Sequence, residues 1–264
     1  TRTRRQRQMC IRDRNINSTN QIFARDIAFA INDKFILPNI INERKSEQHG
    51  ISKIISQIDS ENIIRLDNEI FIEGGDIVLN NNDIFIGYSN NSDFNKYKVA
   101  RTNIKAVKFI EEKFPSKNIH SFELKKDDFN AHKNTLHLDC CFQPLGRNHL
   151  LIHENSFKNT SDLSLLFELF SNEKIIRITD QEMYDLNCNL FSISDDIIVS
   201  DIGFTRVNNI LKNRGFIVEE INFSKILLQR IKLFIREKEK LSSFLICNEI
   251  SISLKEKFLF NILL

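Results

Sequence analysis

The sequence predicts an α/β fold built from four copies of one unit, in which a strand, a turn, a second strand, a helix and a third strand follow one another. Three observations support this prediction. Short apolar runs recur along the chain, turns rich in Asn and Asp separate the first two runs of each copy, and a stretch with helical spacing precedes the third run. A supersecondary unit that recurs along the chain indicates a repeat architecture, in which the copies pack side by side.

The copies follow one another from residue 21 to residue 223, with the elements in the same order each time. The expected pairs of strands, helices and third strands lie at 21–40, 46–58 and 62–66; at 68–89, 101–114 and 119–124; at 136–157, 161–170 and 174–179; and at 187–202, 206–215 and 216–223. In the second copy, Val107, Ile110 and Phe114 have the spacing of one helix face. In the fourth copy, Gly215 is a typical helix stop.

A polar residue recurs at one position of each copy when the copies are aligned on their turns. These residues are Asp26, Asp76, Asp139 and Asn189, and the alignment places each at the end of a first strand. If the copies surround an axis, these groups converge and form a site for a cation. The alternative is a set of surface turn acids, but apolar sequence surrounds Asp26 and Asp139, where an unpaired charge is costly.

The segment "TLHLDCCFQPLG", residues 135–146, raises the question of a nucleophile. In a strand, His137, Asp139 and Cys141 share one face and Cys140 lies on the other. Four residues along a strand separate Cys141 from His137 by roughly 13 Å, whereas a nucleophile and its base require about 3 Å. We therefore interpret both cysteines as small buried apolar residues, and expect any nucleophile to come from elsewhere in the chain.

Composition excludes several classes of protein. No apolar run approaches the roughly 20 residues of a membrane span, and no signal peptide is visible at the start. An odd number of cysteines, five, without metal-type spacing predicts reduced thiols in a cytoplasmic protein. His149 and His153 lie in a predicted strand, where a separation of four does not converge on an ion, so we predict no metal site and no cofactor.

The net charge of +2 is unevenly distributed. Residues 1–14 hold six arginines and Asp13, and residues 224–264 are also basic, which leaves 15–223 acidic. The first block could be an arm for nucleic acid, but it lacks interleaved aromatic residues and resembles translated adapter sequence, so we treat it as a non-native leader. An acidic body favours a small cationic ligand over a nucleic acid.

Four short motifs together resemble one family. They are "FARD" at 23–26, "IEGGD" at 72–76, "ARTN" at 100–103 and "HLD" at 137–139. In this order they resemble the guanidino-group-modifying enzymes of the pentein fold: arginine deiminase, dimethylarginine dimethylaminohydrolase and the amidinotransferases. The resemblance covers about residues 20–226. It implies a propeller of repeated ββαβ units around a pseudo-fivefold axis, so four visible copies imply an incomplete propeller.

The resemblance also implies roles for individual residues. A guanidinium is planar and protonated, and it is bound by carboxylates, which the family places at Asp26 and Asp139. His137 is the implied general acid and base, and Glu73 the carboxylate that orients it. Arg101 matches an arginine that holds a substrate carboxylate. Asp76 either adds to the ligand cage or caps backbone N–H groups. The choice between hydrolysis and amidino transfer, and the identity of the guanidino substrate, also stay open.

The family's nucleophilic cysteine has no counterpart that we identify. It belongs to a Gly-rich segment late in the chain, where this sequence has Ile235 and no glycine between 216 and 264. Cys247 lies about twelve residues too late. Residues 227–264 therefore read as a frameshifted or divergent tail after a pentein domain at 15–226. We expect a guanidino-group hydrolase that is inactive without this cysteine; the alternatives are an amidinotransferase of the same fold, a non-catalytic guanidino-ligand binder or an inactive fragment.

Overall fold

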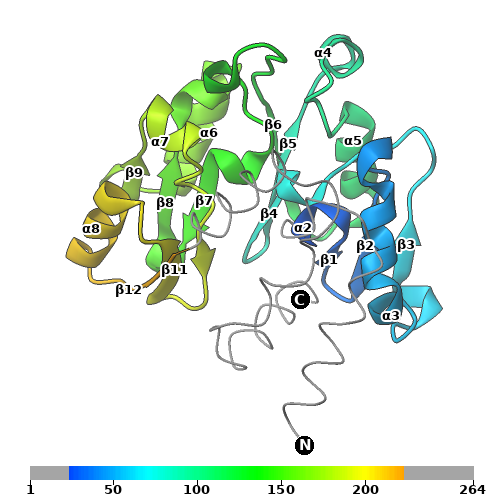
Figure 1. The fold of residues 1–264 in the computed structure, drawn as a ribbon, viewed down its shortest axis with the longest axis horizontal. Helices are drawn as coiled ribbons and strands as arrows, with labels where there is room; N and C mark the ends of the chain where they lie inside the picture. Colours follow the sequence, from blue (N-terminus) through cyan, green and yellow to red (C-terminus); the bar gives the residue numbers. More distant parts are fainter. Residues whose placement is uncertain (1–23, 223–264) are drawn as a thin grey trace, which may run out of the picture. The chain divides into compact units, whose positions relative to one another are not determined.

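The computed structural model describes residues 24–222 of the chain (Figure 1). The leader assigned to residues 1–14 and the tail assigned to 227–264, with Ile235 and Cys247, lie outside the described residues. The chain divides into two compact units, one containing residues 24–66 and the other Asp67–Asn222. Among the helices of the described residues, none combines the length and the apolar character that crossing a bilayer requires.

The first unit holds the first copy of the repeat. Its elements are α2 (Ala24–Ile27), β1 (Phe29–Ile31), β2 (Lys34–Leu37), the 3-10 helix η2 (Asn42–Ile51), α3 (Ser52–Ile55), η3 (Ser60–Asn62) and β3 (Ile63–Arg65). β1 and β2 are antiparallel, and β3 joins β2 in parallel. The hairpin turns at Asn32, whose φ of 54° lies in the left-handed region that asparagine tolerates.

The second unit holds the other three copies, each with its own three-stranded sheet. The second copy comprises η4 (Gly74–Asp76), β4 (Ile77–Asn80), β5 (Asp83–Tyr88), α4 (Asn91–Lys96), α5 (Ile104–Lys113) and β6 (Asn118–Glu123). The third comprises η5 (Ala131–Lys133), η6 (Leu138–Cys140), β7 (Phe142–Leu145), η7 (Gly146–Asn148), β8 (His149–Ile152), η8 (Glu154–Ser156), α6 (Thr160–Leu169), η9 (Asn172–Lys174) and β9 (Ile175–Arg177). The fourth comprises α7 (Asp180–Tyr184), β10 (Phe191–Ser192), β11 (Ile197–Asp201), α8 (Thr205–Asn213) and β12 (Ile217–Ile221).

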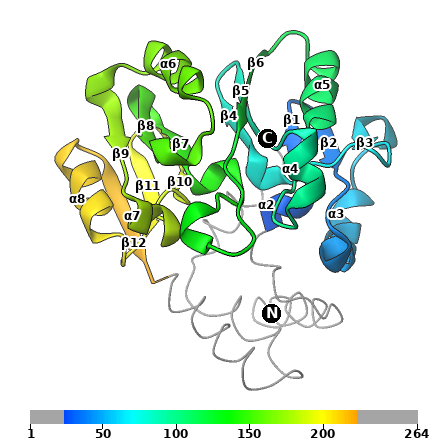
Figure 2. The ribbon, with the colours of Figure 1, turned by 90° about the horizontal axis from the view of Figure 1, so that it is seen from above.

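All four sheets of the described residues have the same topology, an antiparallel hairpin followed by a parallel third strand. A parallel third strand requires a crossover, and a helix supplies it in each copy. In the second unit, α5 packs against β5 and β6, and α8 against β12 (Figure 2). The prediction of an α/β fold with four strand–strand–helix–strand copies is therefore confirmed.

Local signals explain the best-predicted helices. α5 begins after Asn103, whose side chain accepts a hydrogen bond from the backbone N–H of Ala106. Its buried face includes Val107 and Ile110, and Phe114 is buried directly after it. α8 is followed by Gly215 with a φ of 83°, the left-handed stop that the sequence predicts. The helix expected at 46–58 is instead mostly 3-10, followed by one short α-helical turn.

The position of the recurrent polar residues was predicted wrongly. Asp26 lies on α2, Asp76 on η4 and Asp139 on η6, so each is on a helical turn that precedes the first strand of its copy. The strand face proposed for 137–141 does not exist either. The backbone N–H of Cys141 bonds to the carbonyl of Leu138 at 2.9 Å, which closes a turn, and β7 begins only at Phe142.

The core of the second unit is continuous across its three copies. Its large side chains include a group of aromatic rings, in which Phe85 contacts Phe122, Phe142 and Phe170. The first unit has a smaller core around Phe35 and its neighbours. The second unit therefore provides a rigid support for the turns that carry polar residues.

Candidate active site

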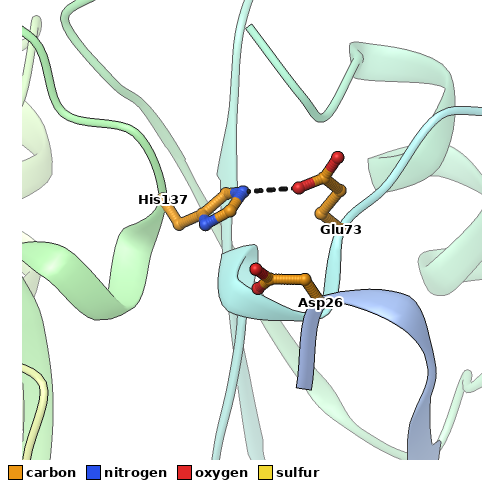
Figure 3. A group of neighbouring side chains, drawn as sticks. All are labelled: Asp26, Glu73 and His137. Carbon is orange, nitrogen blue, oxygen red and sulfur yellow. Dashed lines mark hydrogen bonds and ion pairs between the residues drawn. The ribbon is translucent and has the colours of Figure 1, made fainter. Parts of the chain in front are cut away.

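Glu73 and His137 form a buried hydrogen-bonded pair that joins the second and third copies (Figure 3). The imidazole Nε2 lies 3.0 Å from the carboxylate Oε2, and the side chains are 5% and 1% exposed. Each residue has extended backbone directly before a 3-10 turn, Glu73 before η4 and His137 before η6. A carboxylate in this position fixes the orientation of an imidazole and stabilises its protonated form, as acid–base catalysis requires.

Asp76 links the two halves of this pair. Its Oδ1 accepts a hydrogen bond from the backbone N–H of Leu138 at 2.9 Å, and its Oδ2 accepts one from the Thr102 hydroxyl at 2.6 Å. The Thr102 oxygen in turn accepts the backbone N–H of Glu73 at 3.2 Å. Burial raises the pKa of Asp76, and the nearby charges of His137 and Lys126 oppose this shift. Asp76 therefore binds a backbone N–H group, which was one of the two alternatives for it.

Arg101 lies beside the same pair. Its Nη1 is 3.4 Å from Oε1 of Glu73, and its side chain is only 16% exposed. Its buried Nε has no hydrogen-bond partner among the residues that the structure describes. A buried guanidinium N–H of this kind destabilises the protein unless another group accepts a hydrogen bond from it.

Asp139 lies within the 3-10 turn that follows His137, and it is buried. The thiol of Cys140 is 3.7 Å from its Oδ1. Besides Asp76, the site within the second unit thus contains two further carboxylates with different neighbours. Glu73 contacts His137 and Arg101, and Asp139 lies beside a thiol.

Asp26 belongs to the first unit and is buried there. Its Oδ2 accepts a hydrogen bond from Nη1 of Arg44 at 2.6 Å, and Arg44 also pairs with Glu47 at 2.9 Å. This arginine was not singled out in the sequence, since a basic residue in a weakly patterned segment gives no local signal. The carboxylate of Asp26 therefore already binds one guanidinium group.

The three cysteines of the described residues are buried thiols that take part in no disulfide bond. Burial raises the pKa of Cys141 and of Cys188 well above the usual value for a thiol. Neither group has the depressed pKa of an activated nucleophile. The histidines at 149 and 153 are engaged separately, His149 with the Gly146 carbonyl and His153 with Ser156 and Asp180.

Two polar residues of this region were missed. Lys126 is buried in the segment between β6 and β7, and its Nζ donates to the carbonyls of Thr135 and Leu136 at 2.6 and 2.7 Å. Thr102 is part of the motif "ARTN", in which the sequence indicates a role only for Arg101. Lys126 follows another lysine and precedes two aspartates, a pattern that is typical of a solvated loop, so the sequence offered no sign of its burial.

Known proteins resemble this chain in sequence and in fold. Residues 7–209 match the family described as N,N dimethylarginine dimethylhydrolase, eukaryotic. The uncharacterized protein YkgA of Bacillus subtilis (strain 168) is 27% identical over 208 residues, which are 78% of this chain and 65% of that protein. The chain thus spans less than two thirds of the length of this relative.

Two solved structures illustrate the similarity of fold. ArgZ, an arginine dihydrolase from the ornithine–ammonia cycle in cyanobacteria, superposes with a TM-score of 0.64 and 19% identity over 80% of this chain and 31% of its own. The dimethylarginine dimethylaminohydrolase of Pseudomonas aeruginosa, a Cys-to-Ser mutant with citrulline, has a TM-score of 0.59 and 20% identity over 85% of this chain and 74% of its own. The fold is thus that of the pentein enzymes, and by its sequence this chain belongs to the dimethylarginine dimethylhydrolase family.

Proposed function

We propose that this chain carries the guanidino-binding and acid–base part of a hydrolase that acts on the carbon–nitrogen bond of an arginine-like substrate. The observation that carries the proposal is the buried hydrogen bond between His137 and Glu73, on the motifs that the family resemblance assigns to catalysis. The family match and solved relatives described as an arginine dihydrolase and a citrulline complex support the same substrate class.

The carboxylates are assigned to the substrate's guanidinium group. We assign this role to Asp139 and Asp26, because planar N–H donors pair well with carboxylate oxygens. Arg101 is assigned to the substrate's α-carboxylate, and its buried Nε without a partner among the described residues supports this.

The reaction needs a thiolate that attacks the guanidinium carbon. In the proposed first step a carbon–sulfur bond forms, the carbon–nitrogen bond breaks, and His137 gives its proton to the departing amine, which leaves a thiouronium. In the second step His137 takes a proton from water, the water oxygen bonds to the carbon, and the thiolate leaves. An amine in place of water would give amidino transfer.

Among the described residues, no cysteine suits this thiolate. Cys140, Cys141 and Cys188 are buried, and Cys10 and Cys247 lie outside the described residues. This observation favours a second candidate, a guanidino-ligand binder without catalysis. We also propose the cytoplasmic location that the cysteine usage predicts.

Incubation with 2-chloroacetamidine, followed by mass spectrometry of the peptides, distinguishes these candidates. We expect no adduct on the three buried cysteines, and no citrulline from arginine or dimethylarginine. An adduct on Cys247 that disappears in His137→Ala would contradict the absence of a nucleophile and establish the covalent mechanism. An adduct on Cys141 that survives in His137→Ala would argue against the assigned roles altogether.

A further inference from the structure

Lys126 is a buried lysine of the second unit to which the proposed reaction assigns no role. It is 7% exposed, and lysine is almost never fully buried unless its ammonium group is paired. Burial lowers the pKa of Lys126, and the neighbouring charge of Asp76 opposes this shift. A buried lysine is costly, so the groups that its ammonium contacts indicate its role.

The contacts of Lys126 converge on the peptide groups directly before His137. Its Nζ donates to the carbonyl of Thr135 at 2.6 Å and to that of Leu136 at 2.7 Å. These two carbonyls belong to the peptide groups that lead into the histidine. Two short hydrogen bonds from one ammonium group to successive carbonyls therefore fix the direction in which the chain enters His137.

The peptide group directly after His137 is held by a buried residue of opposite charge. Asp76 accepts the backbone N–H of Leu138 at 2.9 Å. The backbone on the N-terminal side of the histidine is thus bound by Lys126, and the backbone on its C-terminal side by Asp76. Since Asp76 also binds Thr102, which binds the backbone of Glu73, the same network fixes both members of the pair.

We propose that Lys126 is a positioning residue for His137. Together with Asp76, Lys126 holds the backbone on both sides of the histidine and so sets the angle at which the imidazole meets Glu73. The proposal deepens the proposed function and rests on it, because there His137 is the acid and base. Displacement of a catalytic group by about 1 Å is enough to cost a large part of its effect.

The hydrogen bonds of Lys126 are tested first in the unmodified chain. In protein labelled with 15N and 13C, scalar couplings across hydrogen bonds should connect Nζ of Lys126 with the carbonyl carbons of Thr135 and Leu136. This measurement needs no variant, and so it does not depend on whether a variant folds. Absence of both couplings in the folded protein would overturn the proposal.

The consequence for His137 is tested with Lys126→Met, which keeps the length of the side chain and removes its charge and donors. The matched control is Lys125→Met, because Lys125 is the exposed neighbour. The readout is solvent exchange of the His137 ring N–H that is hydrogen-bonded to Glu73, assigned by its loss in His137→Asn. We expect exchange at least about tenfold faster in Lys126→Met and unchanged in Lys125→Met.

Two outcomes separate positioning from a merely structural role. A lower melting temperature of Lys126→Met with unchanged exchange at His137 would overturn the proposal, because lost stability alone leaves this hydrogen bond intact in the folded molecules. Faster exchange in the folded protein supports it. Neither measurement uses substrate turnover or binding, so failure of the proposed function would leave the result interpretable by itself.

Discussion

Replacement of Asp76 by alanine is expected to lower the free energy of unfolding by roughly 3 kcal/mol, because it leaves two buried donors without an acceptor. These donors are the backbone N–H of Leu138 and the hydroxyl of Thr102. The same substitution removes a negative charge near Lys126 and so leaves a buried ammonium less well compensated. Equilibrium unfolding by urea measures the effect.

The control for this variant is Asp83→Ala. Asp83 is partly exposed and pairs with His120 at 2.8 Å, so its loss should lower the free energy of unfolding by less than about 1 kcal/mol.

The pH dependence of the free energy of unfolding provides a second check on the role of Asp76. The folded pKa of Asp76 is raised, so the folded chain keeps this proton at pH values where the unfolded chain has lost it. The excess stability of the unmodified chain over Asp76→Ala should therefore decrease as the pH rises from about 3.8 through the raised pKa. Equal stability of the two chains at all pH values would contradict the role of Asp76.

Replacement of Gly146 by alanine is expected to destabilise the protein by about 3 kcal/mol or more, since the added methyl group has no room. A Cβ at this position would lie 2.0 Å from the carbonyl oxygen and 2.3 Å from the Cα of Asp195. These are backbone atoms, so the clash requires the turn of the third copy to move away from the turn of the fourth. Thermal unfolding monitored by circular dichroism measures the loss.

Gly203→Ala is the matched control for Gly146→Ala. A Cβ at Gly203 meets only the carboxylate Oδ1 of Asp201, at 2.9 Å, and the end of a side chain shifts more easily than backbone. We expect a much smaller change in melting temperature for this variant. If the two variants lost equal stability, the close contact between the copies would not be the cause of the effect at Gly146.

The repeat was predictable from the sequence because it rests on local signals. Short apolar runs and Asn-rich turns such as that at Asn81 act within a few residues and recur in the copies, and the stop at Gly215 is a local signal of the same kind. The positions of Asp76 and Asp139 on helical turns were not predictable in the same way. Each of these 3-10 turns is only three residues long, and no periodicity in so short a segment distinguishes a turn from the end of a strand.

The candidate site was predictable only through its motifs. The family resemblance pointed to Glu73 and His137, which the fold brings within hydrogen-bond distance although they are 64 residues apart. Lys126 and Thr102 depend on tertiary contacts that leave no mark on the local sequence. The link through Asp76 is of the same kind, since it joins residues of two copies that only the fold makes neighbours.

Titration calorimetry with arginine and with ornithine tests most directly whether the site around His137 and Asp139 binds a guanidinium group. The two ligands share the α-amino acid part, and only arginine carries the guanidino group. We expect arginine to bind at least about tenfold more tightly than ornithine, and Asp139→Asn to remove most of this difference, because charged hydrogen bonds to a guanidinium are worth more than neutral ones. The exposed Asp128→Asn should behave like the unmodified chain. Equal affinities for the two ligands, or an arginine affinity that Asp139→Asn leaves unchanged, would contradict guanidinium binding at this site.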